Sequence, residues 1–312
     1  MKYPKISIIM PAYKEEEVIG DTLRHLFEEI NYPKLEIIVA VDTEEDKTYK
    51  IVKSFAKKYK NLKVDFSPER RGFAVAIDSA LQKATGDIIV KSDAEVRYLN
   101  PHECMHLLIK HFEDKKVGGI RFKFKPYNLD LINEKEKGWA AKGEIFMNEL
   151  VSDWCENKCP VIQGRWNLPL VCNSFRRFLV PHLDTKVICD DAEYGYNVLE
   201  KGYKIIFASD IVVYFVGVPG DSKRLFLQKR RGAVGWYKMS ENRNIKLFDY
   251  YSKFIWYYLT HFYEYSLEEG IAFFYWCFLY SFILIAAYGK RHEESKNIWI
   301  KYKRDVKSSE TK

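Results

Sequence analysis

Carboxylates follow three of the first four strands that the sequence predicts, and they are the side chains best suited to chemistry. Glu15 comes after the first strand and Asp42 after the second. Asp93 and Glu95 follow the fourth, and their spacing lets both approach one cation or one ribose edge. Hard divalent cations take oxygen ligands and bridge to phosphates. A single acidic loop is usually only solvated, but acidic loops on successive strands predict a site for a phosphorylated ligand.

Alternating strands and helices over the first 130 residues position these loops. The expected strands are Lys5–Met10, Leu35–Val41, Leu62–Phe66 and Asp87–Lys91. The expected helices are Glu16–Ile30, Thr48–Tyr59 and Phe73–Ala84, each with apolar residues at helical spacing. This alternation predicts an α/β fold with a mostly parallel sheet and helices on both faces. Ligands on such sheets bind at the carboxyl ends of the strands, where the acidic loops lie.

Composition and missing motifs exclude several classes of protein. The chain has 312 residues, of which 47% are hydrophobic and 30% charged, so it is neither disordered nor too small for a core. Its six cysteines are too few for a disulfide scaffold. No glycine-rich dinucleotide fingerprint follows the first strand, and no P-loop motif occurs. A dinucleotide dehydrogenase and a P-loop enzyme are therefore disfavoured.

The positive charge is concentrated late in the chain. Residues 1–222 are net −1, residues 223–246 net +7, residues 247–289 net −3 and residues 290–312 net +4. No nucleic-acid-binding motif accompanies the one basic stretch with aromatic neighbours, so we expect no nucleic acid as a partner. The basic blocks instead favour an anionic membrane surface.

The segment between the basic blocks is apolar and aromatic. Gly270 to Gly289 runs 20 residues without a charge, which suits a helix that spans about 30 Å of hydrocarbon. A buried core helix is the alternative. Lys253, His261 and Glu264 would make residues 250–267 costly as a second span. We therefore expect interfacial or re-entrant attachment, with the large domain on the cytoplasmic side.

Four segments resemble the nucleotide-binding half of a family 2 glycosyltransferase with a GT-A fold. They read ISIIMPAYKEEEVIGDTLRHL, LEIIVAVDTEEDKT, RRGFAVAIDSAL and GDIIVKSDAE, within residues 5–100. The residues that the resemblance places around a nucleotide-diphosphate sugar are Pro11, Tyr13, Glu15, Asp42, Arg71 and Asp93. Glu95 stands where the family usually has its metal-binding aspartate, so Asp93 and Glu95 are the implied ligands of Mg²⁺ or Mn²⁺.

A later segment, VICDDAEYGYNVLEKGYKIIFASDIVVY, resembles the part of the family that carries the catalytic base. The family has an acid pair at the start of a helix, which here is Asp190 and Asp191. Asp191 aligns with the base, and Asp190 falls on the acceptor side. The helix dipole favours the ionised form that a base needs, although a lone acid at a helix start is often only a cap.

The stretch QKRRGAVGW resembles the Q-x-x-R-W motif of membrane-bound members such as cellulose, chitin and hyaluronan synthases. Gln228 and Arg231 match, whereas Gly232 takes the place of the tryptophan. A guanidinium fork suits phosphate oxygens, so Arg231 is the candidate for stabilising a leaving diphosphate. Gly164 and Trp166 lie where family members have an acceptor loop, although Trp166 could equally be a core residue.

Three parts are therefore expected. Residues 1–100 form a nucleotide-sugar-binding half, residues 101–246 an acceptor and catalytic-base half, and residues 247–312 a helical membrane-associated segment. The predicted activity is metal-dependent, inverting transfer of a sugar, with UDP as the preferred nucleotide, to a carbohydrate or lipid-linked hydroxyl. The alternatives are transfer of one sugar to a polyprenyl phosphate, and an inactive membrane-bound scaffold of the same fold.

Overall fold

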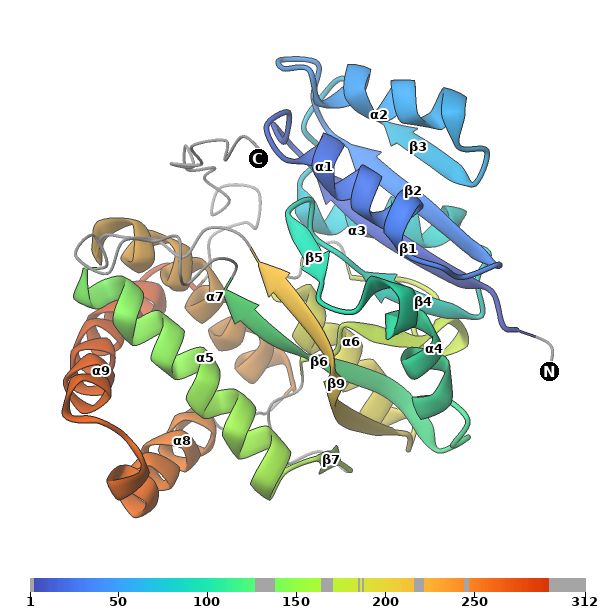
Figure 1. Cartoon of the computed structure of the whole chain (residues 1–312). Helices are drawn as coiled ribbons and strands as arrows, with labels where there is room; N and C mark the ends of the chain where they lie inside the picture. Colours follow the sequence, from blue (N-terminus) through green and yellow to red (C-terminus); the bar gives the residue numbers. More distant parts are fainter. Residues whose placement is uncertain are drawn as a thin grey trace.

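The fold is an α/β sheet domain with a group of helices packed at one end (Figure 1). The computed structural model describes residues 3–126, 138–163, 171–184, 186, 188–215, 222–243 and 247–291. The strands are β1 (Ile6–Ala12), β2 (Leu35–Val41), β3 (Leu62–Phe66), β4 (Ile88–Lys91), β5 (Val96–Tyr98), β6 (Val117–Pro126), β7 (Val161–Ile162), β8 (Ser174–Arg176) and β9 (Lys204–Phe215).

Helices alternate with the first strands as expected. The α-helices are α1 (Ile19–Arg24), α2 (Thr48–Lys58), α3 (Phe73–Lys83), α4 (Pro101–His111), α5 (Trp139–Lys158), α6 (Asp190–Glu200), α7 (Ser222–Arg243), α8 (Leu247–His261) and α9 (Leu267–Tyr288). Shorter turns are a π-helical η1 (His25–Glu29), which continues α1, and 3₁₀ turns η3 (Arg177–Leu179) and η4 (Phe262–Glu264).

The described strands form one mixed sheet, in the order β3-β2-β1-β4-β8-β6-β9-β5, with β7 on β9. The predicted parallel pairing is correct for β3, β2, β1 and β4. It is wrong for the sheet as a whole, because β8 is antiparallel to both β4 and β6, and β5 and β7 are antiparallel to β9. Strand β5 follows β4 closely in the chain but pairs with β9, at the far end of the strand order.

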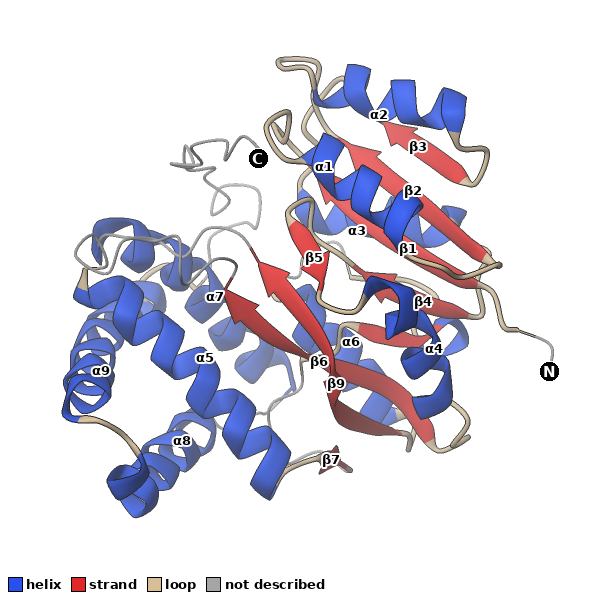
Figure 2. Ribbon diagram, viewed as in Figure 1, coloured by secondary structure: helices blue, strands red, loops and turns tan. Residues whose placement is uncertain are grey.

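Helices cover both faces of the sheet (Figure 2). On one face, Leu23 of α1 and Met105 of α4 pack into one buried cluster. On the other, Ile77 of α3, Leu150 of α5 and Val198 of α6 pack into a second. Strand β2 is buried along its whole length, which explains its almost continuous apolar sequence.

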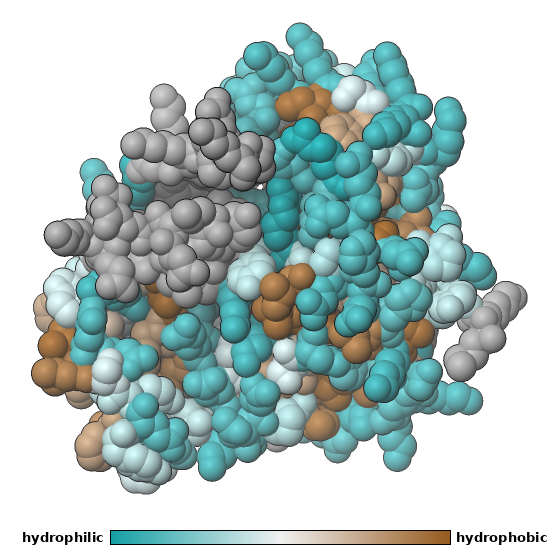
Figure 3. Space-filling model, in the orientation of Figure 1, coloured by the Kyte–Doolittle hydropathy of each residue, from teal (hydrophilic) through white to brown (hydrophobic). Residues whose placement is uncertain are grey.

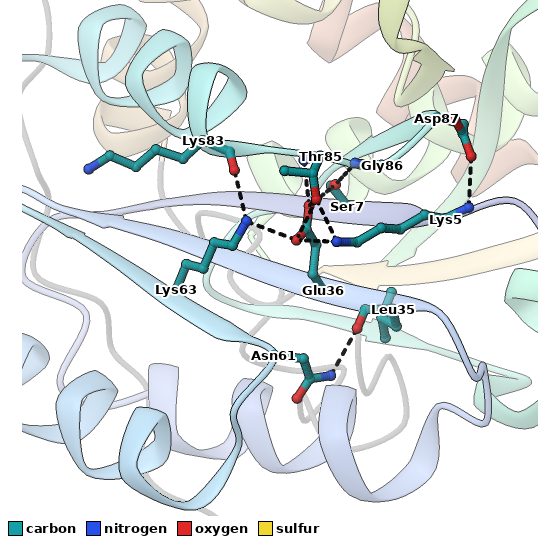
Figure 4. A network of polar contacts seen from close by, with 10 residues as sticks. All are labelled: Lys5, Ser7, Leu35, Glu36, Asn61, Lys63, Lys83, Thr85, Gly86 and Asp87. Atoms are coloured by element: carbon teal, nitrogen blue, oxygen red, sulfur yellow. Dashed lines mark hydrogen bonds and ion pairs between the residues drawn. The ribbon is translucent and has the colours of Figure 1, made fainter.

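A buried carboxylate holds the amino-terminal ends of the first strands together (Figure 4). Glu36 of β2 is 3% exposed. It accepts hydrogen bonds from Ser7 Oγ at 2.6 Å and from the Thr85 backbone N–H at 2.6 Å. The Nζ atoms of Lys5 and Lys63 lie 2.9 and 3.0 Å from its Oε2. Burial alone would raise the pKa of Glu36, but these partners hold it well below its ordinary value.

A second buried acid, Glu144 of α5, joins the helices at the end of the domain. Trp276 of α9 donates its indole N–H to Glu144 Oε2 at 3.1 Å. Lys229 of α7 forms an ion pair with Glu144 Oε1, and the Asn148 amide donates to the same oxygen at 3.0 Å. Gly143 permits the close approach, because a Cβ there would lie 2.9 Å from the Ala272 carbonyl. One carboxylate therefore fixes α7 and α9 on α5.

We predict that Glu36→Gln lowers the free energy of unfolding by about 2–3 kcal/mol, because charged hydrogen bonds are lost. A carboxylate with a depressed folded pKa adds stability above its unfolded value of about 4.3, and this stability is lost as the pH falls towards the folded pKa. Urea unfolding at pH 7 and pH 3.5 should therefore show a smaller loss on acidification in Glu36→Gln than in wild type. Equal losses would contradict this role of Glu36.

Candidate active site

A buried ammonium connects the two halves of the candidate site. Lys91 is the last residue of β4, and its side chain is 12% exposed. Its Nζ lies 2.8 Å from Asp93 Oδ1 and 3.9 Å from Asp190 Oδ2. Burial alone would lower the pKa of Lys91, but Asp190 and Asp93 raise it above its ordinary value. The positive charge is therefore retained, and it brings an acid of the β4 loop next to an acid of α6.

The two adjacent aspartates at the start of α6 differ in environment. Asp190 is 6% exposed. Its burial raises its pKa to about 7, against the opposing effect of Lys91 and with a further increase from Asp191 and Asp93. Asp191 is only half-buried, and its Oδ1 accepts the Ala192 backbone N–H at 2.9 Å. Asp191 is thus the more accessible carboxylate, while Asp190 is buried beside Lys91.

The loops after β2 and β3 are joined by an arginine. The Nε and Nη2 of Arg71 both lie 2.8 Å from Asp42 Oδ1, and the Arg71 backbone N–H donates to Asp42 Oδ2 at 3.0 Å. Asp42 is buried, which raises its pKa, while Arg71 counteracts the shift. Arg70 stacks over the Tyr13 ring at 4.6 Å from its centroid. Together these residues line the carboxyl ends of the strands with an aromatic ring and paired charges.

Helix α7 packs closely against the start of α6. The thiol of Cys189, the residue before α6, lies 3.4 Å from the Gly232 carbonyl oxygen. A Cβ on Gly235 would come within 2.4 Å of Cys189 Sγ, whereas a Cβ on Gly232 would meet no atom within 4 Å. Gly235 therefore permits the helix contact, whereas a side chain at position 232 would point into open space.

Arg231 interacts electrostatically with the thiol of Cys189, and so do Asp190 and Asp191. Burial, Asp191 and Asp190 raise the pKa of Cys189 well above its ordinary value, and Arg231 lowers it. The structure thus brings Arg231 of α7 towards the start of α6. Gln228, three residues earlier on α7, is exposed.

The remaining predicted residues occupy the same edge of the sheet or cannot be placed. Pro11 is part of β1 and pairs with Ala40. Glu15 follows β1, and its backbone N–H donates to Thr48 Oγ1 at 2.7 Å. Glu95 is half-buried in the turn after Asp93. The proposed acceptor residues Gly164 and Trp166 lie outside the described residues.

Asp93 and Glu95 fit a divalent cation by the chemistry of their oxygens. In the described part of the chain, no group of three or more His, Cys, Asp or Glu side chains is arranged to hold a metal. Mg²⁺ is commonly held by one or two carboxylates together with water and substrate phosphates. These two residues therefore match an ion whose other ligands come from a diphosphate and from solvent.

Reasoning from the sequence alone missed Lys91 as part of the site. A signal was present, because Lys91 ends the otherwise apolar strand IIVK and stands two residues before Asp93. A lysine at the end of a buried strand needs an acidic partner. Its second partner, Asp190, is 99 residues away in the chain, and only the fold reveals it.

Most of the chain is similar in sequence to known proteins. The family model described as glycosyl transferase family 2 matches residues 7–162. A probable glycosyltransferase of Bacillus subtilis, YdaM, is 30% identical over 225 residues, which cover 65% of this chain and 49% of the relative. A dolichol-phosphate mannosyltransferase of Pyrococcus furiosus is 27% identical over 224 residues, which cover 67% of this chain and 61% of the relative. The matched region spans about half to three fifths of the length of these two relatives.

Solved structures share the fold. The mannosyltransferase PcManGT of Pyrobaculum calidifontis, in complex with GDP-Man and Mn²⁺, has a TM-score of 0.62 and 21% identity, over 93% of this chain and 88% of that one. TarS 1–349 of S. aureus, in complex with UDP-GlcNAc, has a TM-score of 0.53 and 17% identity, over 92% and 80% of the two chains. These likenesses confirm the predicted GT-A type of fold. The resemblance to the cellulose, chitin and hyaluronan synthases stays a prediction.

Two glycines of α7 form a matched pair for testing how this helix is positioned. We expect Gly235→Ala to lower the free energy of unfolding by about 1–3 kcal/mol, because the added methyl group overpacks against Cys189. Gly232→Ala should raise it by up to about 1 kcal/mol, since alanine favours a helix and meets no neighbour there.

The measurements are urea unfolding and the rate at which a thiol reagent labels Cys189. Labelling should accelerate in Gly235→Ala and stay unchanged in Gly232→Ala. The close packing of α7 on Cys189 would be refuted if the two variants behaved alike.

Proposed function

The chain belongs to glycosyl transferase family 2, and from this premise we propose that it is an inverting glycosyltransferase that uses a nucleotide-diphosphate sugar, with UDP as the nucleotide. The observation that carries the proposal is the Lys91 ammonium, which lies between Asp93 and Asp190. It connects the β4 loop, on the donor side of the family's fold, with the helix start that carries Asp191.

The donor is proposed to lie over the carboxyl ends of β1 to β4. Pro11, Tyr13, Glu15, Asp42 and Arg71 would surround its base and ribose, as the family resemblance implies. The paired charges of Asp42 and Arg71 support this placement, because such a pair presents both acceptors and donors to a nucleoside. TarS 1–349 has been solved with UDP-GlcNAc, which supports UDP, whereas PcManGT has been solved with GDP-Man.

The leaving diphosphate needs positive charge near it. Mg²⁺ or Mn²⁺, when held by Asp93 and Glu95, would neutralise charge on the diphosphate. Arg231 on α7 would add a guanidinium that can bind phosphate oxygens in a fork. Gln228 is proposed to face the same side of the site.

Asp191 is proposed to be the general base. Its carboxylate would accept the proton of the acceptor hydroxyl while the hydroxyl oxygen attacks the anomeric carbon from the face opposite the diphosphate. The new carbon–oxygen bond forms as the bond to the diphosphate oxygen breaks, and the nucleoside diphosphate departs with its electron pair. The half-buried position of Asp191, next to the buried Asp190, supports Asp191 as the carboxylate that reaches the acceptor. Asp190 is proposed to act on the acceptor side, as the family resemblance implies.

A polyprenyl phosphate is the second candidate acceptor. The Pyrococcus furiosus relative is named a dolichol-phosphate mannosyltransferase, which favours transfer to a lipid-linked acceptor. The replacement of the family tryptophan by Gly232 points the same way, since that tryptophan belongs to the acceptor end in polymer-forming members. The domain is proposed to lie on the cytoplasmic side, because the anionic lipids of that leaflet attract the basic residues 223–246 and 290–312.

The direct test is nucleotide release from UDP-, GDP- and dTDP-sugars, measured with and without membrane extract. We expect release of UDP that requires Mg²⁺ or Mn²⁺ and stops when EDTA removes the ion. Short lipid-linked products would favour the polyprenyl-phosphate acceptor. Release from none of the three donor classes, under any of these conditions, would contradict the proposal and favour the inactive scaffold.

We predict that Asp191→Asn lowers the rate of transfer by about 10²–10⁴-fold, the usual contribution of a general base. Binding of UDP, measured by calorimetry, should change little, because Asp191 belongs to the acceptor side.

Glu200→Gln is the matched control, since Glu200 is an exposed acid at the other end of α6. It should leave transfer unchanged. Transfer by Asp191→Asn at a rate comparable to wild type would show that another residue is the base.

A further inference from the structure

Helix α9 presents a row of large apolar side chains to the outside. Its members recur every three or four residues, so they share one helix face. This apolar stripe consists of Leu267, Ile271, Phe274, Phe278, Phe282 and Ile285, and Leu267 is 82% and Phe278 66% exposed. In Figure 3, hydrophobic residues gather at the lower left edge of the molecule, where Figure 1 shows α9. Soluble monomers rarely expose such a continuous apolar surface without a partner for it.

Polar contacts join α9 to α5 and α7 near its start, at its middle and just past its end. In its first turn, Glu268 forms an ion pair with Lys142 of α5. In its middle, Trp276 donates to Glu144, which is also paired with Lys229 of α7. Just past its end, Arg291 Nε lies 3.0 Å from Glu241 of α7. Helix α9 is therefore part of the domain and cannot turn away from α5 and α7 without breaking these contacts.

These contacts are incompatible with α9 as a transmembrane span. In the described residues, α9 alone is long and apolar enough to cross a membrane, and 28% of its most apolar window is buried. Trp276 lies near the middle of the helix, so a spanning α9 would bring the Glu144–Lys229 pair to the bilayer centre. Arg230 and Arg231, the next residues of α7, would then also enter the bilayer, at a cost of roughly 2.5–3.5 kcal/mol for each charge. The energetically acceptable orientation of α9 is parallel to the membrane surface.

Helix α8 adds exposed apolar side chains and positive charge next to α9, since the centroid of the Tyr258 ring lies 6.0 Å from that of Phe274 in the apolar stripe. Ile255, Trp256 and Leu259 are each at least 42% exposed. Beside them is an open depression with a volume of about 460 Å³. Its lining includes Lys158, Lys253 and His261 as well as the rings of Trp154, Trp256 and Tyr257. Amines next to aromatic rings at the edge of an apolar surface complement anionic lipid headgroups.

We propose that α8 and α9 form a monotopic docking face for an anionic phospholipid bilayer, with α9 lying in the plane of the membrane. The apolar stripe would enter the boundary between headgroups and acyl chains, and the lysines of the depression would contact lipid phosphates. The lysines of the depression beside α8 favour a bilayer with anionic headgroups over a second copy of the chain, because two copies joined across this depression would bring those lysines together. This inference does not rest on the proposed transfer reaction.

Vesicle flotation tests the docking face with the full chain. We expect wild type to float with POPC/POPG vesicles and to bind pure POPC vesicles more weakly. The double variant Phe274→Asp/Phe278→Asp should lower binding to POPC/POPG at least tenfold. The matched control is Phe178→Asp, because Phe178 is an aromatic residue that is 61% exposed on η3, outside the α8–α9 surface. It should bind like wild type.

Two results would overturn the proposal. One is binding of the double variant at the wild-type level. The other is self-association of wild type without vesicle binding, if the double variant abolishes it, because the apolar stripe would then be a contact between copies. Circular dichroism of both variants should match wild type, since the substituted side chains are exposed.

Protease protection distinguishes an in-plane helix from a span. In sealed membrane vesicles from cells that express the chain with a tag after Lys312, the tag and the sheet domain should be digested together or protected together, because an in-plane α9 leaves both on the same side of the bilayer. Digestion of one with protection of the other would contradict the in-plane orientation of α9.

Discussion

The site depends on one buried positive charge. The ammonium of Lys91 lies between Asp93 of the β4 loop and Asp190 of α6, and without it several acids would repel one another at the edge of the sheet. A buried charge is tolerated only when it is paired. The pairing therefore fixes where α6 begins relative to β4, and so where Asp191 lies relative to the loops proposed to bind the donor.

Helix α7 connects this site with the proposed docking face. Arg231 lies within range of the thiol next to the aspartates, while Lys229, two residues away, is paired with Glu144 on α5. Glu144 in turn accepts a hydrogen bond from the indole N–H of Trp276 on α9. Within the basic block of residues 223–246, Arg231 thus lies near the candidate site, whereas Lys229 holds α7 on α5. If α9 lies on a membrane, these contacts of α7 with α5 and α9 hold the candidate site at a fixed distance from the membrane surface.

Local patterns predicted the first half of the fold well. The bounds of β2 and β3 agree with the sequence prediction, and α2 and α3 differ from it by one residue at their ends. Periodicity and strand-end loops are local properties, so the acidic edge of the sheet could be predicted too. The antiparallel β8 could not, because its pairing with β4 depends on contacts between residues far apart in the chain. The same reason hid the pairing of Lys91 with Asp190 and of Arg71 with Asp42, since charge pairs across the fold leave no spacing signal.

The central claim is that one carboxylate activates an acceptor for direct displacement at the anomeric carbon. The stereochemistry of the product tests it most directly. Proton NMR during the reaction of a UDP-α-sugar, with an acceptor or with water, identifies the anomer that forms first. The account predicts a β-configured product, because a single displacement inverts the anomeric carbon. An α-configured first product would show retention and would contradict the mechanism.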